Sequence, residues 1–128
     1  MAEGFAKHLL SNDKSIIDSA GITADGLNKL AVIVMSEVGI DITPQESKEI
    51  STINFNKFDL IVTVCDNARS VCPIIPGKKT IHKDLLDPAL SAGPINDQLI
   101  IYRSVRDQIQ ILVKELLNNY NEICQERN

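Results

Sequence analysis

The fold of this 128-residue sequence is decided by Asp59-Leu-Ile-Val-Thr-Val-Cys65-Asp-Asn-Ala-Arg-Ser-Val-Cys72-Pro73. The apolar run from Leu60 to Val64 is short, rich in β-branched residues and followed by Asp-Asn, which predicts a buried strand. Cys65 would then stand at the carboxyl end of that strand. Because sites in open parallel sheets form at this edge, the stretch predicts a functional site that contains a cysteine.

A second cysteine, Cys72, follows seven residues after Cys65. If residues 65–72 were helical, the two Cα atoms would lie about 10 Å apart, at a rise of about 1.5 Å per residue. A disulfide needs Cα atoms within about 7 Å of each other. The two thiols could therefore bridge only if this segment unwinds, which would make the pair a redox switch. The alternative is that both cysteines pack as small hydrophobic side chains, and the spacing alone leaves both interpretations open.

Composition bounds the class of protein. The sequence is 44% hydrophobic and 23% charged, which is ordinary for one globular domain over residues 1–128. A net charge of −4 gives no basic footprint for nucleic acid, and no apolar run is long enough to span a membrane. Three cysteines do not make a disulfide framework, and the first residues lack a signal-peptide pattern. We therefore expect a cytoplasmic protein that binds neither nucleic acid nor membrane.

Hydrophobic periodicity predicts three helices around the central strand. They span Ala2–Leu10, Gly26–Val38 with Asp25 as a candidate N-cap, and a long helix from Asn96 to Ile123. The predicted apolar faces include Ala2, Phe5, Ala6 and Leu9 in the first helix, Leu27, Leu30, Ala31, Val34, Met35 and Val38 in the second, and Ile101, Val105, Ile109, Leu112 and Val113 in the third. Arg103, Arg106, Asp107 and Lys114 are expected on the solvated face of the long helix.

Three shorter elements complete the prediction. Residues 15–19 and 79–82 are expected to form short strands, and Thr43-Pro44-Gln45-Glu46 has the form of a capping box that starts a helical turn through Ile50. Strands that alternate with helices indicate a parallel sheet with helices on both faces. The expected fold class is therefore doubly wound α/β.

Seven short motifs occur in an order that resembles a known family. They are Met1-Ala-Glu-Gly-Phe-Ala-Lys, Ser19-Ala-Gly21, Gly39-Ile-Asp-Ile-Thr43, Asp59–Cys65, Cys72-Pro73, Asp87-Pro88-Ala89 and Tyr102-Arg-Ser-Val-Arg-Asp107. Together they resemble the thioredoxin-coupled arsenate reductases of the low-molecular-weight protein tyrosine phosphatase superfamily, over nearly the whole chain. The resemblance implies the α/β fold of that superfamily, a three-layer parallel sheet with helices on both faces.

The resemblance also implies a cysteine relay that reduces arsenate to arsenite. In the family, a Cys-x5-Arg loop binds the oxyanion and its cysteine attacks arsenate. A second cysteine attacks the first and releases arsenite, and a third attacks the second to leave a disulfide that thioredoxin reduces. By motif, Cys65 resembles the second cysteine, Cys72 the third, and Asp87 the aspartate that protonates the leaving oxygen. The unwinding that geometry requires between Cys65 and Cys72 agrees with such a relay.

One part of the family pattern is missing from the sequence. No cysteine is followed by five residues and Arg, because the sixth residue after Cys65 is Val71 and the sixth after Cys72 is Lys78. We therefore expect the first strand and the nucleophile loop to be absent, the domain to be N-terminally incomplete, and this chain to be inactive alone. Two alternatives stay open: a low-molecular-weight protein tyrosine phosphatase, which would need no cysteine pair, and a non-catalytic, redox-responsive remnant.

The remaining polar residues suggest no cofactor. Glu3 and Ser19 resemble parts of a potassium site in some of these reductases, but Lys48 stands where a carboxylate is expected, so we predict no bound metal ion. His82 is expected to be a hydrogen-bonded strand histidine, with a catalytic role as the alternative. The expected partners are arsenate or a phosphate-like oxyanion in the complete protein and thioredoxin as the reductant, and the expected state is a monomer.

Overall fold

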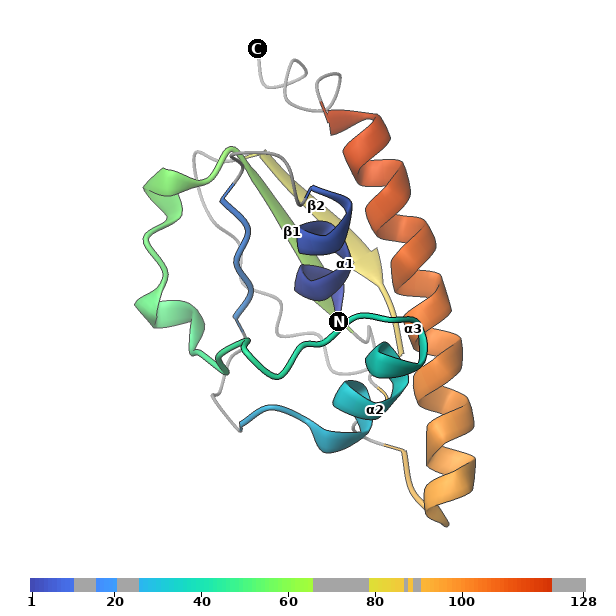
Figure 1. The fold of residues 1–128 in the computed structure, drawn as a ribbon. Helices are drawn as coiled ribbons and strands as arrows, with labels where there is room; N and C mark the ends of the chain where they lie inside the picture. Colours follow the sequence, from blue (N-terminus) through green and yellow to red (C-terminus); the bar gives the residue numbers. More distant parts are fainter. Residues whose placement is uncertain (11–15, 21–25, 66–78, 87, 89–90, 121–128) are drawn as a thin grey trace.

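The computed structural model describes residues 1–10, 16–20, 26–65, 79–86, 88 and 91–120 (Figure 1). Three α-helices, α1, α2 and α3, and two strands, β1 and β2, are joined by loops that include two short 3-10 helices. The bounds are α1 Ala2–Leu9, α2 Lys29–Glu37, 3-10 turns Ile50–Thr52 and Phe55–Lys57, β1 Leu60–Cys65, β2 Lys79–Asp84 and α3 Ile95–Asn118.

The sheet confirms the parallel pairing predicted around the central strand. In the part of the chain that the structure describes, β1 and β2 form a two-stranded parallel sheet, with Leu60 opposite Lys79 and Cys65 opposite Asp84. Leu60 to Thr63 are only half-buried and Val64 is 43% exposed, so the prediction of a buried strand is wrong in its burial. Its β-branched side chains still favour the extended backbone.

Helix α2 begins and ends at well-formed caps. The Oδ1 atom of Asn28 accepts hydrogen bonds from the backbone N–H groups of Leu30 and Ala31, at 2.9 and 3.1 Å. The helix therefore begins at Lys29 rather than at Gly26, whose φ of +89° is outside the helical range. At the other end, Gly39 has φ +81° and its N–H donates to the Ser36 carbonyl. The predicted cap at Asp25 lies outside the described residues.

The hydrophobic core lies between the three helices, because α3 packs against both α1 and α2 (Figure 1). The core side chains that are buried are Phe5, Ala31, Val34, Met35, Ile40, Ile42, Tyr102, Val105, Ile109 and Val113. These include seven of the fifteen side chains named above on the predicted apolar faces, and Ala2, Ala6, Leu30 and Ile101 pack against this core while only partly buried. Leu9, Leu27 and Val38 are at least 36% exposed, and each lies at the end of a helix or just beyond it.

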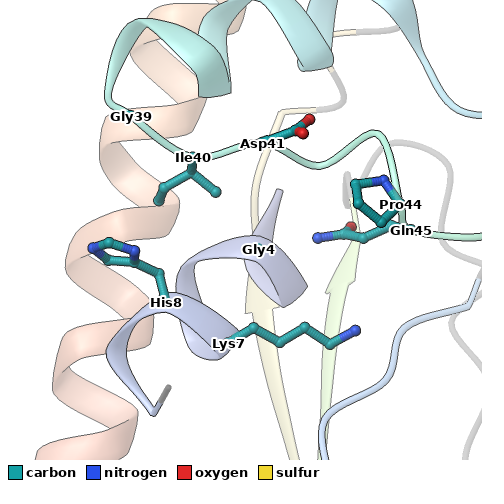
Figure 2. A pocket seen from close by; sticks show the side chains of 8 residues that line it. All are labelled: Gly4, Lys7, His8, Gly39, Ile40, Asp41, Pro44 and Gln45. Atoms are coloured by element: carbon teal, nitrogen blue, oxygen red, sulfur yellow. The ribbon is translucent and has the colours of Figure 1, made fainter. Parts of the chain in front are cut away.

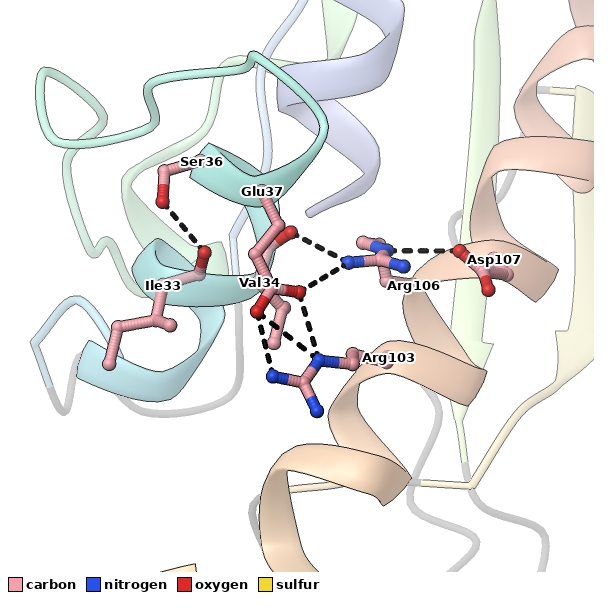
Figure 3. Close-up of polar contacts among 7 residues, drawn as sticks. All are labelled: Ile33, Val34, Ser36, Glu37, Arg103, Arg106 and Asp107. Atoms are coloured by element: carbon pink, nitrogen blue, oxygen red, sulfur yellow. Dashed lines mark hydrogen bonds and ion pairs between the residues drawn. The ribbon is translucent and has the colours of Figure 1, made fainter. Parts of the chain in front are cut away.

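The polar face predicted for α3 needs one correction. Arg106 is only 9% exposed, because its guanidinium reaches the C-terminal turn of α2 (Figure 3). There Nη1 donates to the Val34 carbonyl at 3.0 Å and pairs with the Glu37 carboxylate at 2.9 Å, while Nε pairs with Asp107. The desolvation of this charge is offset because these N–H donors have hydrogen-bond acceptors. Arg103, Asp107 and Lys114 do lie toward solvent.

Two predicted short elements are not formed. Residues 16–19 have no strand structure, since Asp18 and Ser19 are held by side-chain hydrogen bonds to Lys48 and Glu3 rather than by a sheet ladder. The capping box is also absent, because the Thr43 hydroxyl donates to Asp41 at 2.7 Å and so is engaged in a local turn. The first helical turn after Thr43 in the described residues is the 3-10 turn Ile50–Thr52, which starts where the predicted turn was to end.

None of the helices described here has the length and apolar character needed to cross a bilayer.

Candidate functional site

The carboxyl ends of β1 and β2 form the candidate site. Cys65 ends β1 and stands opposite Asp84, which ends β2. Two residues earlier, Thr63 stands opposite His82. This confirms the predicted backbone position of Cys65 at the carboxyl edge of a parallel strand, the edge at which sites in such sheets are built.

Three side chains near this edge form a hydrogen-bonded array. His82 Nδ1 lies 2.8 Å from the Thr63 hydroxyl, and His82 Nε2 lies 2.6 Å from Asp84 Oδ1. An ionised carboxylate can only accept, so the bond to Asp84 requires a hydrogen on Nε2. In the neutral ring, Nδ1 then accepts from Thr63. The interpretation of His82 as a hydrogen-bonded strand histidine is therefore confirmed.

The array is open to solvent at its carboxylate end. The side chains of His82 and Asp84 are 41% and 52% exposed, whereas Thr63 is half-buried. Thr63 and His82 had no signal that linked them in the sequence, because their pairing depends on the register of two strands. The spacing of His82 and Asp84 was visible, since alternate residues of a strand point to the same face.

The structure describes the backbone of Cys65, whereas the other two predicted catalytic residues, Cys72 and Asp87, lie outside the described residues. Their assignment as the third cysteine and the acid of a relay therefore stays a prediction, as does a disulfide between Cys65 and Cys72.

A second polar cluster joins α1 to two neighbouring segments. Glu3 is 5% exposed, and its carboxylate accepts from the Ser19 hydroxyl at 2.5 Å and pairs with Lys7 at 2.7 Å. Asp18, next to Ser19, pairs with Lys48. In the sequence, Glu3 and Ser19 resemble parts of a potassium site. The burial of Glu3 was not predicted, because a charged residue on a helix is normally solvated.

The charges of this cluster are balanced within the chain. Partial desolvation tends to raise the pKa of Asp18, but the hydrogen bonds from Lys48 and from the Ser19 amide outweigh it and lower that pKa. The hydrogen bond to Asp18 raises the pKa of Lys48 despite some desolvation. Within the described residues no group of three His, Cys, Asp or Glu side chains is arranged to hold a metal ion. The ammonium of Lys48 supplies the positive charge beside Asp18.

A cavity of about 310 Å³ lies between α1 and the loop that follows α2 (Figure 2). Its basic side chains are Lys7 and His8, and His8 is exposed, as predicted for a surface helix residue. Its acidic side chain, Asp41, has a lowered pKa because it accepts hydrogen bonds from the Thr43 hydroxyl and amide. None of the described residues that line the cavity is one of the predicted catalytic residues. Its lining is Gly4, Lys7, His8, Gly39, Ile40, Asp41, Pro44 and Gln45.

Comparison with known proteins identifies the family. The family model for low molecular weight phosphotyrosine protein phosphatase matches residues 1–127. The chain belongs to this family. The predicted site residues Cys65, Cys72 and Asp87 all lie inside the region that matches the phosphatase family.

Within the low molecular weight phosphatase family, this chain is similar to proteins named arsenate reductase. It is 41% identical to the one from Shouchella clausii over 116 residues, which covers 90% of this chain and 83% of the relative. It is 42% identical to the one from Bacillus subtilis with the same coverage. A solved structure described as an arsenate reductase in the phosphate binding state matches with a TM-score of 0.69 and 28% identity, over 92% of this chain and 86% of that one.

Proposed function

We propose that this protein is an arsenate reductase that uses the low molecular weight phosphatase fold to reduce arsenate to arsenite. The observation that carries the proposal is an identity of about 40% to proteins named arsenate reductase over nine-tenths of the chain. The position of Cys65 at the carboxyl end of a parallel strand supports it, because that edge is where such a sheet would present a reactive thiol.

The proposed reaction moves two electrons from thiols to arsenic. A nucleophilic cysteine forms a sulfur–arsenic bond with arsenate as water leaves, and Asp87 donates the proton that the departing oxygen needs. Cys65 then attacks that sulfur, so that a disulfide forms and arsenic departs as arsenite with the electron pair of the broken bond. Cys72 attacks Cys65, frees the nucleophile and leaves a Cys65–Cys72 disulfide. A thioredoxin dithiol would reduce this disulfide.

The nucleophile itself is proposed to come from a segment that these 128 residues do not contain. No cysteine of the sequence is followed by five residues and Arg. The guanidinium of such an Arg would bind the oxyanion through two parallel hydrogen bonds. The similar arsenate reductases extend beyond the matched region, which covers 83% of each. We propose that the missing part includes a first strand, and that the complete sheet has helices on both faces. The continuous run of Leu, Ile and Val in β1 suits a strand inside a larger parallel sheet.

The expected oxyanion is arsenate or a phosphate-like anion, in keeping with the similar structure in a phosphate binding state. We propose that the protein is a cytoplasmic monomer and that thioredoxin reduces its exposed Cys65–Cys72 disulfide. A catalytic disulfide fits this compartment, because cytosolic disulfides are transient and catalytic more often than structural. A phosphatase is the second candidate function, favoured by the family model. Phosphate ester hydrolysis would leave the two further cysteines without a role.

The test starts from the endogenous protein. Its intact mass is measured first, and arsenate-dependent NADPH oxidation is then followed with thioredoxin and thioredoxin reductase. Arsenate reduction that is abolished in Cys65→Ser and Cys72→Ser but retained in Cys124→Ser supports the relay, with Cys124→Ser as the matched thiol control. Phosphate ester hydrolysis without arsenate reduction would instead establish the phosphatase. If the endogenous mass equals that of these 128 residues and neither activity is present, the non-catalytic, redox-responsive remnant replaces the enzyme.

A further inference from the structure

The imidazole of His82 is held at both of its nitrogens. The Thr63 hydroxyl from β1 lies at Nδ1, and the Asp84 carboxylate from its own strand lies at Nε2. Among the described residues these are the polar side chains recorded in contact with the ring. A histidine oriented by a carboxylate in this way is prepared to accept a proton, because the carboxylate stabilises the imidazolium that results.

The register of the sheet brings this array next to a cysteine. Cys65 lies two residues after Thr63 on β1, and its register partner on β2 is Asp84. Residues at alternate positions of a strand belong to the same face, and partners in register belong to that face too. Thr63, Cys65, His82 and Asp84 therefore occupy neighbouring positions on one face at the carboxyl edge of the sheet.

We propose that His82, oriented by Asp84, accepts the proton of Cys65 when this thiol becomes an attacking thiolate. The inference rests on the proposed function, in which Cys65 is a nucleophile of the relay. The Thr63 hydroxyl first releases Nδ1 of His82, and the freed lone pair of Nδ1 takes the proton from the sulfur of Cys65. The electron pair left on sulfur makes the new bond. The imidazolium keeps its Nε2–H bond to Asp84, and the Thr63 hydroxyl no longer donates to Nδ1.

A purely structural role for the Thr63–His82–Asp84 array predicts different results. If the array only ties β1 to β2, the loss of either ring contact should lower stability and leave the reactivity of Cys65 unchanged. Thr63→Val separates the two roles, because it removes the tie to β1 with little change of shape and keeps the His82–Asp84 pair. In our proposal Thr63→Val leaves Cys65 reactive, whereas His82→Gln and Asp84→Asn do not.

The experiment measures the alkylation of Cys65 by iodoacetamide from pH 5 to 10. It is carried out in a Cys72→Ser/Cys124→Ser background, where Cys65 is the one thiol left among these 128 residues. The peptide that contains Cys65 is followed by mass spectrometry, so that a nucleophile thiol of the complete protein does not contribute. We expect His82→Gln to slow alkylation at pH 7 about tenfold, the change that follows when the pKa of a thiol rises by one unit. The rates should converge at high pH, where the thiol ionises without help. Asp84→Asn should shift the profile in the same direction by a smaller amount, and Lys83→Gln is the matched control.

Identical pH profiles for the background protein and His82→Gln would overturn the proposal. Circular dichroism confirms that each variant is folded. If His82→Gln does not fold, Asp84→Asn decides, because it keeps the shape of the side chain and removes the charge. The measurement needs neither arsenate nor thioredoxin, so failure of the arsenate assay and failure of this inference are separate results.

Discussion

Nη1 of Arg106 on α3 donates a hydrogen bond of 3.0 Å to the backbone carbonyl of Val34 on α2. Val34 lies in the last turn of α2, where carbonyl groups lack partners within the helix. The same guanidinium pairs with Glu37, which ends the helix (Figure 3). The side chain of one helix thus completes the end of another, and a cation suits the negative end of the helix dipole.

Arg106→Ala should destabilise the fold by about 3 kcal/mol, because it leaves a buried carbonyl unpaired and removes the partner of two carboxylates. The free energy of unfolding in urea measures this effect. Arg103→Ala is the matched control, since Arg103 pairs with the same Glu37 but its side chain is 42% exposed, and its loss should be much smaller. Equal losses for the two variants would show that the contact with Val34 contributes nothing.

The Glu37 carboxylate should make stability depend on pH. Hydrogen bonds from Arg103, and then from Arg106, lower the pKa of Glu37 below its ordinary value of 4.5. The folded state therefore favours the charged form, and this contribution is complete above pH 4.5 and is lost as the pH falls through the lower, folded-state pKa. In urea unfolding between pH 7 and pH 3, Glu37→Gln should lose less stability than the unmodified protein. Parallel curves would refute the assignment, because Asp18 and Asp41 contribute equally to both proteins.

Replacing Gly39 with a residue that has a β-carbon should lower the stability of the protein. It follows α2 with φ +81°, and the Ile40 N–H bonds the Met35 carbonyl at 3.0 Å, which together form a Schellman cap. Gly39→Ala should destabilise the protein by about 1–2 kcal/mol, because a left-handed conformation is strained for an L side chain. Thermal unfolding would measure the loss. Gly39→Asn should lose less than Gly39→Ala, and the reverse order would contradict a backbone origin.

Gly4 should be restricted by packing rather than by its backbone. A β-carbon at this position would lie 2.7 Å from Cγ2 of Ile42, a side chain that is 1% exposed. Gly4→Ala is expected to cost about 1–3 kcal/mol through overpacking. The double variant Gly4→Ala/Ile42→Ala should be less destabilised than the sum of the two single variants, because the second change removes the clash. Additive effects in urea unfolding would exclude this contact as the cause.

The sequence was most informative where one local pattern decides the structure. The periodicity of α2 and α3 predicted their buried faces, and the β-branched run predicted β1 and placed Cys65 at its end. The helix predicted from Thr43 failed because the hydroxyl that should cap it bonds Asp41 instead. The candidate site was predictable in part for the same reason, since the spacing of His82 and Asp84 is local, whereas the pairing of Thr63 with His82 crosses between strands.

What the sequence determined by itself is the set of properties that depend on neighbours along the chain: helical and extended segments, the position of Cys65, and the motifs that the family shares. Only the tertiary structure decided that Arg106 is buried, that Glu3 meets Ser19, and that His82 meets Thr63. Each of these joins residues from distant segments or different elements. The physical reason is that hydrogen bonding and desolvation depend on distances in space, which a linear spacing does not specify until the helices and strands have packed.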